Sequence, residues 1–347
     1  MSRLTFPQPA SGLFSGQPSA HAKRARMVSS NASLLELRIV PWLGLGAGVL
    51  LGLLVPQFTW ALDWLPFLVS LFFLGMPHGA MDWFVQNRLG GVTGIPSQCR
   101  AFLPYLLWMC LSIACLVFAP VLTIAAFMVL TIIHFGTADL LATRHGGDSL
   151  LRRVLFIAGR GSLVLGPLFA FHPESSWKPF GLLVGMFPVD AAFLSNLSVI
   201  GLAVLFIGVV LALVHVVGTG MRDPRSALLD LFESMLILAL GCLVAPLFAI
   251  GLFFLSTHAY RHSVRLVSEP FEPDFSKSRP ALWSRLLVMH LRCIPLLAPT
   301  MVILVAWSII QFGTITPYLL VVVSIGFFII STLPHHLLGL KLPRYRP

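Results

Sequence analysis

The stretch IVPWLGLGAGVLLGLLVP, Ile39 to Pro56, contains no charged residue along its whole length. An α-helix rises about 1.5 Å per residue, so a stretch of this length crosses most of the roughly 30 Å hydrocarbon core of a bilayer. Similar apolar stretches recur as far as PYLLVVVSIGFFII, Pro317 to Ile330. The repetition predicts a chain that crosses a membrane many times.

The composition favours the same fold class. Of the 347 residues, 57% are hydrophobic and 10% are charged, which is unlike an average soluble domain. The net charge of +10 would suit nucleic acid, but the basic residues lie dispersed at the ends of apolar stretches, where membrane topology places them. We expect an all-α, polytopic transmembrane helix bundle in a lipid bilayer, with no nucleic-acid partner.

The apolar stretches can be divided at prolines, glycines and charge clusters into about ten spans, with a range of eight to ten. For the seventh and eighth spans, LGCLVAPLF (Leu240 to Phe248) is consistent with a turn between two helices or with a kink inside one. The predicted spans are 38–56, 61–84, 102–119, 121–142, 153–172, 195–217, 228–243, 246–266, 286–311 and 316–339.

The distribution of charge predicts the domain organisation and the orientation. Residues 1–37 are rich in Ser, Ala, Gly and Pro and carry the basic cluster KRAR, so we expect a disordered basic tail. A transmembrane catalytic bundle over 38–340 and a cytoplasmic tail over 341–347 follow. With ten spans, most of the 23 Lys and Arg residues fall on one side. The positive-inside rule then predicts an inner-membrane protein with both termini cytoplasmic.

Histidines recur at one depth in this topology. The second, fourth, eighth and tenth spans run in the same direction, and each carries histidine in its later part. Polar side chains inside a membrane are costly and tend to face the bundle interior, so the pattern predicts one buried polar site. The histidines are His78 in GMPHGAMDW, His134 in IIHFGTADL, His258 and His262 in STHAYRH, and His335 and His336 in TLPHHLLG.

The spacing of these histidines is typical of metal ligands. His258 and His262 are four residues apart, so they share one helical face and can place two ring nitrogens on one ion. His78 and His134 are candidates for two more ligands. Imidazole suits iron, zinc and copper.

Other polar residues are candidates to orient those ligands, because a ligating histidine usually needs an acceptor for its second ring nitrogen. Asp82 can reach back to His78 within one helix or direct its carboxylate to another helix. For Asp139 we expect a partner on another helix, and the alternative for both aspartates is a solvated position near the cytoplasmic interface. The full set of such candidates is Asp82, Asp139, Tyr260, His335 and His336.

At these residues the sequence resembles the Brp/Blh family of β-carotene 15,15′-dioxygenases. The matching pieces are GMPHGAMD, HFGTAD, HAYRH and LPHH, in that order. The resemblance implies a membrane enzyme that uses Fe(II) and O2 to cleave β-carotene at its central double bond into two molecules of all-trans-retinal. It also implies a functional link to a retinal-binding opsin. The residues that it assigns to catalysis and to the metal are His78, His134, His258 and His262.

Three other functions compete with this one. A transporter or channel for protons or metal ions with a His/Asp site would need polar residues along a path across the membrane, whereas here they concentrate in the inner halves of the spans. A haem protein with two axial histidines is the second alternative. A zinc hydrolase is the third, although HAYRH lacks the glutamate of the HExxH motif.

Overall fold

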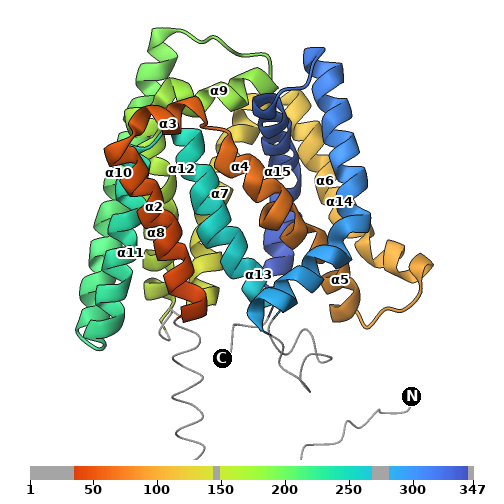
Figure 1. The fold of residues 1–347 in the computed structure, drawn as a ribbon, viewed down its shortest axis with the longest axis horizontal. Coiled ribbons are helices and arrows are strands. Elements are labelled where there is room, and N and C mark those ends of the chain that lie inside the picture. The colour runs from red at the N-terminus through yellow and green to blue at the C-terminus, as the bar shows by residue number, and fades with distance from the viewer. Residues whose placement is uncertain (1–34, 144–148, 268–280, 343–347) are drawn as a thin grey trace, which may run out of the picture.

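The structure is a computed structural model that describes residues 35–143, 149–267 and 281–342. All regular elements in these ranges are helices, packed side by side as a bundle (Figure 1). They are η1 (Leu35–Ile39), α2 (Val40–Leu54), α3 (Pro56–Ala61), α4 (Leu65–Ser70), η2 (Leu71–Gly75), α5 (Met76–Leu89), α6 (Ile95–Phe118), α7 (Pro120–Thr143), α8 (Leu150–Phe171), α9 (Pro173–Leu183), α10 (Ala191–Gly220), α11 (Pro224–Leu243), α12 (Pro246–Phe253), η3 (Phe254–Ala259), α13 (Tyr260–Leu266), α14 (Leu282–Phe312) and α15 (Pro317–Gly339), where η marks a π-helical turn.

Within the described ranges, nine helical stretches are long and apolar enough to cross a membrane. They correspond to nine of the predicted spans, so the all-α polytopic bundle is confirmed. The remaining span, 246–266, is the continuous stretch α12–η3–α13. It is less apolar than the others because it carries Thr257, His258, Arg261 and His262.

The division between the seventh and eighth spans is a turn rather than a kink. Helix α11 ends at Leu243, Val244 is extended with φ −121° and ψ 149°, and α12 begins at Pro246.

Helix α9 was not predicted from the sequence, and it lies in the link between the fifth and sixth spans. The predicted tails fall almost wholly on residues 1–34 and 343–347, outside the described ranges, and stay predictions.

The four histidine-bearing segments run in the same direction. Each of α4–η2–α5, α7, α12–η3–α13 and α15 starts at the end of the bundle that α9 crosses and descends toward the opposite end, where α2 begins (Figure 1). Histidines in the later parts of these segments therefore lie toward the same end of the bundle.

Glycines let α7 and α8 approach to backbone contact. A Cβ atom added to Gly136 of α7 would collide with the carbonyl oxygen of Ile157, and one added to Gly161 of α8 would collide with that of Ile132. In a bilayer, such close van der Waals contact drives helix association. Gly136 follows His134 by two residues, so this contact fixes the position of a histidine-bearing turn.

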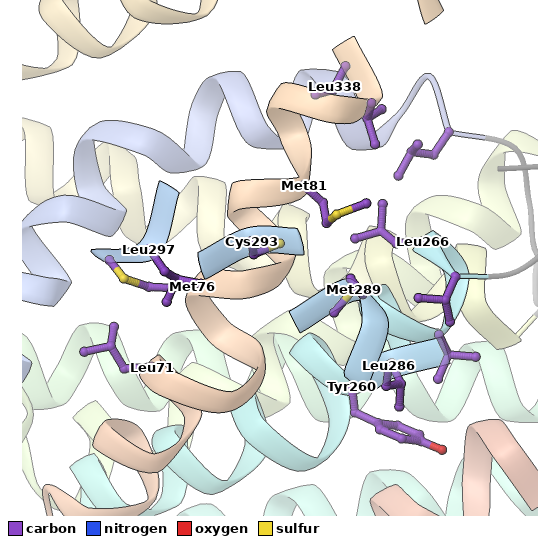
Figure 2. Packing of buried hydrophobic residues seen from close by; sticks show 14 of the residues in the cluster. Leu71, Met76, Met81, Tyr260, Leu266, Leu286, Met289, Cys293, Leu297 and Leu338 are labelled. Atoms are coloured by element: carbon purple, nitrogen blue, oxygen red, sulfur yellow. The ribbon is translucent and has the colours of Figure 1, made fainter. Parts of the chain in front are cut away.

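A hydrophobic cluster fixes α5 against α13 and α14. Met76 and Met81 of α5 pack with Met289 and Cys293 of α14, and Tyr260 of α13 joins them (Figure 2). The Cys293 thiol also donates a hydrogen bond to the carbonyl oxygen of Pro77, over 3.2 Å. These contacts hold the turn that carries His78.

Candidate metal centre

One histidine of the predicted site lies within a π-helical turn, and another follows such a turn closely. The N–H of Met76 bonds the carbonyl of Leu71, five residues back, in the turn that precedes His78. His258 lies inside the second such turn, η3. Single π turns within α-helices occur frequently at functional sites. Both turns alter the face that the following residues present, so they help to aim the imidazoles.

Six imidazole rings from four segments form one buried cluster. The ring centroids of His134 and His258 are 4.6 Å apart, and those of His78 and His262 are 5.2 Å apart. All six side chains are buried. The cluster consists of His78, His134, His258, His262, His335 and His336.

Some of the ring nitrogens lie close enough together to share one metal ion. The Nε2 atoms of His134 and His258 are 3.2 Å apart. Two nitrogens, each about 2.1 Å from a shared ion, lie about 3.0 to 3.4 Å apart for angles from square to tetrahedral. One ring nitrogen from each of His78, His258 and His335 also lies within 4.8 Å of the others.

Several of these nitrogens have no hydrogen-bond partner in the part of the chain that the structure describes. Both ring nitrogens of His262, Nδ1 of His258 and Nε2 of His335 are buried without a hydrogen bond to any described residue. A buried polar atom without a partner is costly, and a bound cation would satisfy one nitrogen lone pair on a histidine such as His262 or His335. The donor set therefore fits a metal ion, and its purely imidazole chemistry suits iron, zinc, copper or nickel.

The residues predicted to brace the ligands have different partners. Asp82 lies 2.7 Å from Nδ1 of His335 on another helix, whereas Nδ1 of His78 donates to the carbonyl of Leu74 over 2.8 Å. Nδ1 of His336 faces Nδ1 of His134 at 3.2 Å. Tyr260 turns toward α14, with its ring 6.3 Å from that of Trp283.

Asp139 has partners on two other helices, and both are arginines. Its Oδ1 lies 2.9 Å from Arg261 and its Oδ2 lies 3.6 Å from Arg160. Asp82 and Asp139 are both buried, so the alternative that they are solvated is wrong.

A cavity of about 420 Å³ opens beside the histidines. Its walls are mostly aromatic and aliphatic, and His78, His134, His258 and His335 are among the lining residues. One part extends toward α9, where Phe180 lines it. Another is lined by α6 and α14. The site thus joins a polar nitrogen cluster to a large apolar space inside the bundle, which suits an apolar ligand.

Comparison with known proteins identifies the family. The family model described as beta-carotene 15,15′-dioxygenase matches residues 69–343, which is most of the chain. The chain belongs to the β-carotene 15,15′-dioxygenase family. A relative described as "Probable beta-carotene 15,15′-dioxygenase Blh", from Halobacterium salinarum, is 28% identical over 218 residues. That alignment covers 58% of this chain and 61% of the relative. No solved structure matches the chain.

The dioxygenase family match contains all six clustered histidines and both aspartates. It also contains Tyr105, which the sequence analysis missed: its hydroxyl donates to Oδ2 of Asp82 over 2.8 Å. No local pattern links Tyr105 to the site, since it lies in an ordinary apolar stretch of α6. The one feature of the sequence that could have pointed to Tyr105 was a hydroxyl group among apolar neighbours.

A buried ion network next to the histidines was also missed. Arg261, between His258 and His262 in sequence, makes two hydrogen bonds to Glu233 of α11, of 2.7 and 2.8 Å. Charged residues inside apolar stretches were the available signal. The network comprises Arg38, Asp139, Arg160, Asp230, Glu233 and Arg261, and all of them are buried.

Proposed function

We propose that this protein is a membrane-embedded dioxygenase that cleaves β-carotene with O2 at the central 15,15′ double bond, giving two molecules of all-trans-retinal. Iron(II) is the proposed cofactor, with His78, His134, His258 and His262 as its ligands. The observation that carries the proposal is the convergence of buried imidazoles from four helical segments on the wall of an aromatic cavity.

Iron bound there would supply the activation of O2 that oxidative cleavage of a carbon–carbon double bond requires. The residues of the chain provide the rest of the environment. Nδ1–H of His78 donates to Leu74, which leaves Nε2 as the free lone pair. Phe135 and Phe254 lie beside His258, with ring centroids 4.7 and 5.4 Å away. Such rings would contact a polyene and would shield the cluster from water.

The surroundings suit a long apolar substrate. A carotenoid is about as long as the roughly 30 Å hydrocarbon core is thick, so it dissolves in the bilayer and can reach the cavity from lipid. Basic residues concentrate at the end of the bundle toward which the histidines lie, and this supports the proposed inner-membrane location with cytoplasmic termini. A retinal-binding opsin is the proposed recipient of the product.

Expression in bacteria that accumulate β-carotene tests the activity. We expect the orange colour to fade and retinal to appear, with pigments separated by chromatography. The purified protein should contain close to one equivalent of iron and should lose activity on chelation. Undiminished β-carotene beside well-expressed membrane protein would refute the proposal. So would stoichiometric zinc with activity restored by zinc alone.

A further inference from the structure

His335 of α15 has one ring nitrogen engaged and one available. Its Nδ1 lies 2.7 Å from Oδ2 of Asp82. An ionised carboxylate can only accept, so Nδ1 carries the proton and Nε2 keeps a lone pair. That Nε2 atom is buried and has no hydrogen-bond partner among the described residues. His335 therefore presents a nitrogen lone pair that no described residue satisfies.

The ring of His335 lies within the cluster, beside the histidines that the family resemblance assigns to the metal. Its centroid is 5.2 Å from that of His78, 5.2 Å from that of His134 and 5.1 Å from that of His262. One ring nitrogen each of His335, His78 and His258 lies within 4.8 Å of the other two. With Nδ1 engaged by Asp82, Nε2 is the atom of His335 that can share an ion with them.

His78 and His335 are held in the same way. In His78, Nδ1–H donates to the backbone oxygen of Leu74, and in His335, Nδ1–H donates to the carboxylate of Asp82. Metal-ligating histidines almost always donate their second N–H to such an acceptor, which fixes the tautomer and the ring orientation. His335 therefore meets this criterion for a metal ligand as well as His78 does, because in both rings Nδ1–H is held by an acceptor.

Asp82 itself is held by a second donor. The hydroxyl of Tyr105 donates to the same Oδ2 atom over 2.8 Å, so this oxygen receives hydrogen bonds from both α6 and α15. Tyr105 also lines the cavity. The chain of contacts Tyr105–Asp82–His335 thus connects the cavity wall with the imidazole cluster across three helices.

We propose that His335 is an additional ligand of the metal ion, through Nε2, and that Asp82 and Tyr105 are positioning residues that hold it for that role. The inference rests on the metal site of the proposed function. It adds a ligand from α15 to the four histidines of α5, α7, η3 and α13, and it gives Asp82 a specific task.

Co²⁺ titration of purified metal-free protein in detergent tests the assignment, because the visible absorption of Co²⁺ reports its ligands. We expect Asp82→Asn to weaken Co²⁺ affinity by roughly 10- to 100-fold, as for other residues that orient ligands. His335→Ala should weaken it further and change the spectrum, and Tyr105→Phe should have the smallest effect. His290→Ala is the matched control, since His290 stacks on Phe73 and is not one of the six clustered histidines.

A second variant separates ligation from folding. In His335→Gly, added imidazole should restore Co²⁺ affinity and the wild-type spectrum. The proposal is overturned if His335→Ala binds Co²⁺ with wild-type affinity and spectrum. It is also overturned if imidazole restores nothing in a His335→Gly protein whose metal-free form unfolds at the wild-type temperature.

Co²⁺ binding tests the assignment of His335 as a ligand separately from the cleavage activity. Weakened Co²⁺ binding by His335→Ala, in a protein that leaves β-carotene intact, would support the ligand and refute the proposed activity. Retinal formation by wild-type protein, together with unchanged Co²⁺ binding by His335→Ala, would refute the ligand and leave the activity standing.

Discussion

Glu233 shares its two carboxylate oxygens among three guanidinium groups and an indole. Arg261 binds both oxygens, Arg160 and Arg38 each approach one to 3.6 Å, and the Trp42 N–H donates over 2.9 Å. Arg261 directly precedes His262, so this carboxylate anchors the helical turn that presents His258 and His262. Removing one partner of such a network leaves buried charge without compensation.

We therefore expect Glu233→Ala to lower the free energy of unfolding by about 3–5 kcal/mol, the usual cost of breaking a buried ion pair. Thermal unfolding of metal-free protein in detergent measures the change. Glu174→Ala on the exposed side of α9 is the control and should stay within about 0.5 kcal/mol of wild type. Equal stabilities of the two variants would show that the network does not support the bundle.

The sequence predicted only some of the contacts between individual residues. The spacing of His258 and His262 fixes a shared face because four residues are close to one helical turn. The bond between Asp82 and His335 joins positions 253 residues apart, and no local pattern encodes it. The same holds for Arg38 and Asp230, which are 192 residues apart.

At the scale of elements, the helices that carry the site depend on close backbone approach. Gly136 and Gly161 let α7 and α8 touch, and no side chain fits at either position without displacement. The apolar stretches predicted the spans because their length matches the bilayer. The π turns η2 and η3 were not predictable in the same way, because they depend on what each helix packs against.

Gly136→Ala should separate α7 from α8 and move His134. We expect a loss of about 1–3 kcal/mol in the free energy of unfolding, as for other overpacked cores, together with weaker Co²⁺ binding. Gly46→Ala on α2 is the control, since a Cβ there would meet nothing within 4 Å. It should be neutral or stabilising, by up to about 1 kcal/mol, through helix propensity. Unfolding in detergent and Co²⁺ titration measure both variants, and a Gly136→Ala protein that matches Gly46→Ala in both would contradict the close approach.

At the scale of the whole molecule, the direction of the spans decides which surface each loop faces. Lys178 on α9 and Arg225 at the start of α11 are both exposed. Helix α9 and the start of α11 lie at opposite ends of the bundle (Figure 1). The sequence predicted this arrangement through the asymmetry of basic residues alone. It could not place α9 across the end of the bundle, since that depends on tertiary contacts.

Single cysteines at these two positions test the orientation, in a background without the five native cysteines. In intact cells, a membrane-impermeant maleimide should label Lys178→Cys, whereas Arg225→Cys should react only after permeabilisation. The reverse pattern would invert the proposed orientation. Labelling of both positions from the same side would contradict the fold itself.

Helix α6 contains no fully buried residue along its 24 positions, yet Phe102, Tyr105 and Met109 line the cavity. The wall on this side is a single helix thick, and in a bilayer its outer surface would face acyl chains. Lateral pressure from lipid therefore presses on the cavity through α6. The affinity of the cavity for its ligand should therefore depend on bilayer thickness and acyl-chain order. Transfer of the protein from a membrane to a detergent micelle changes the pressure on α6.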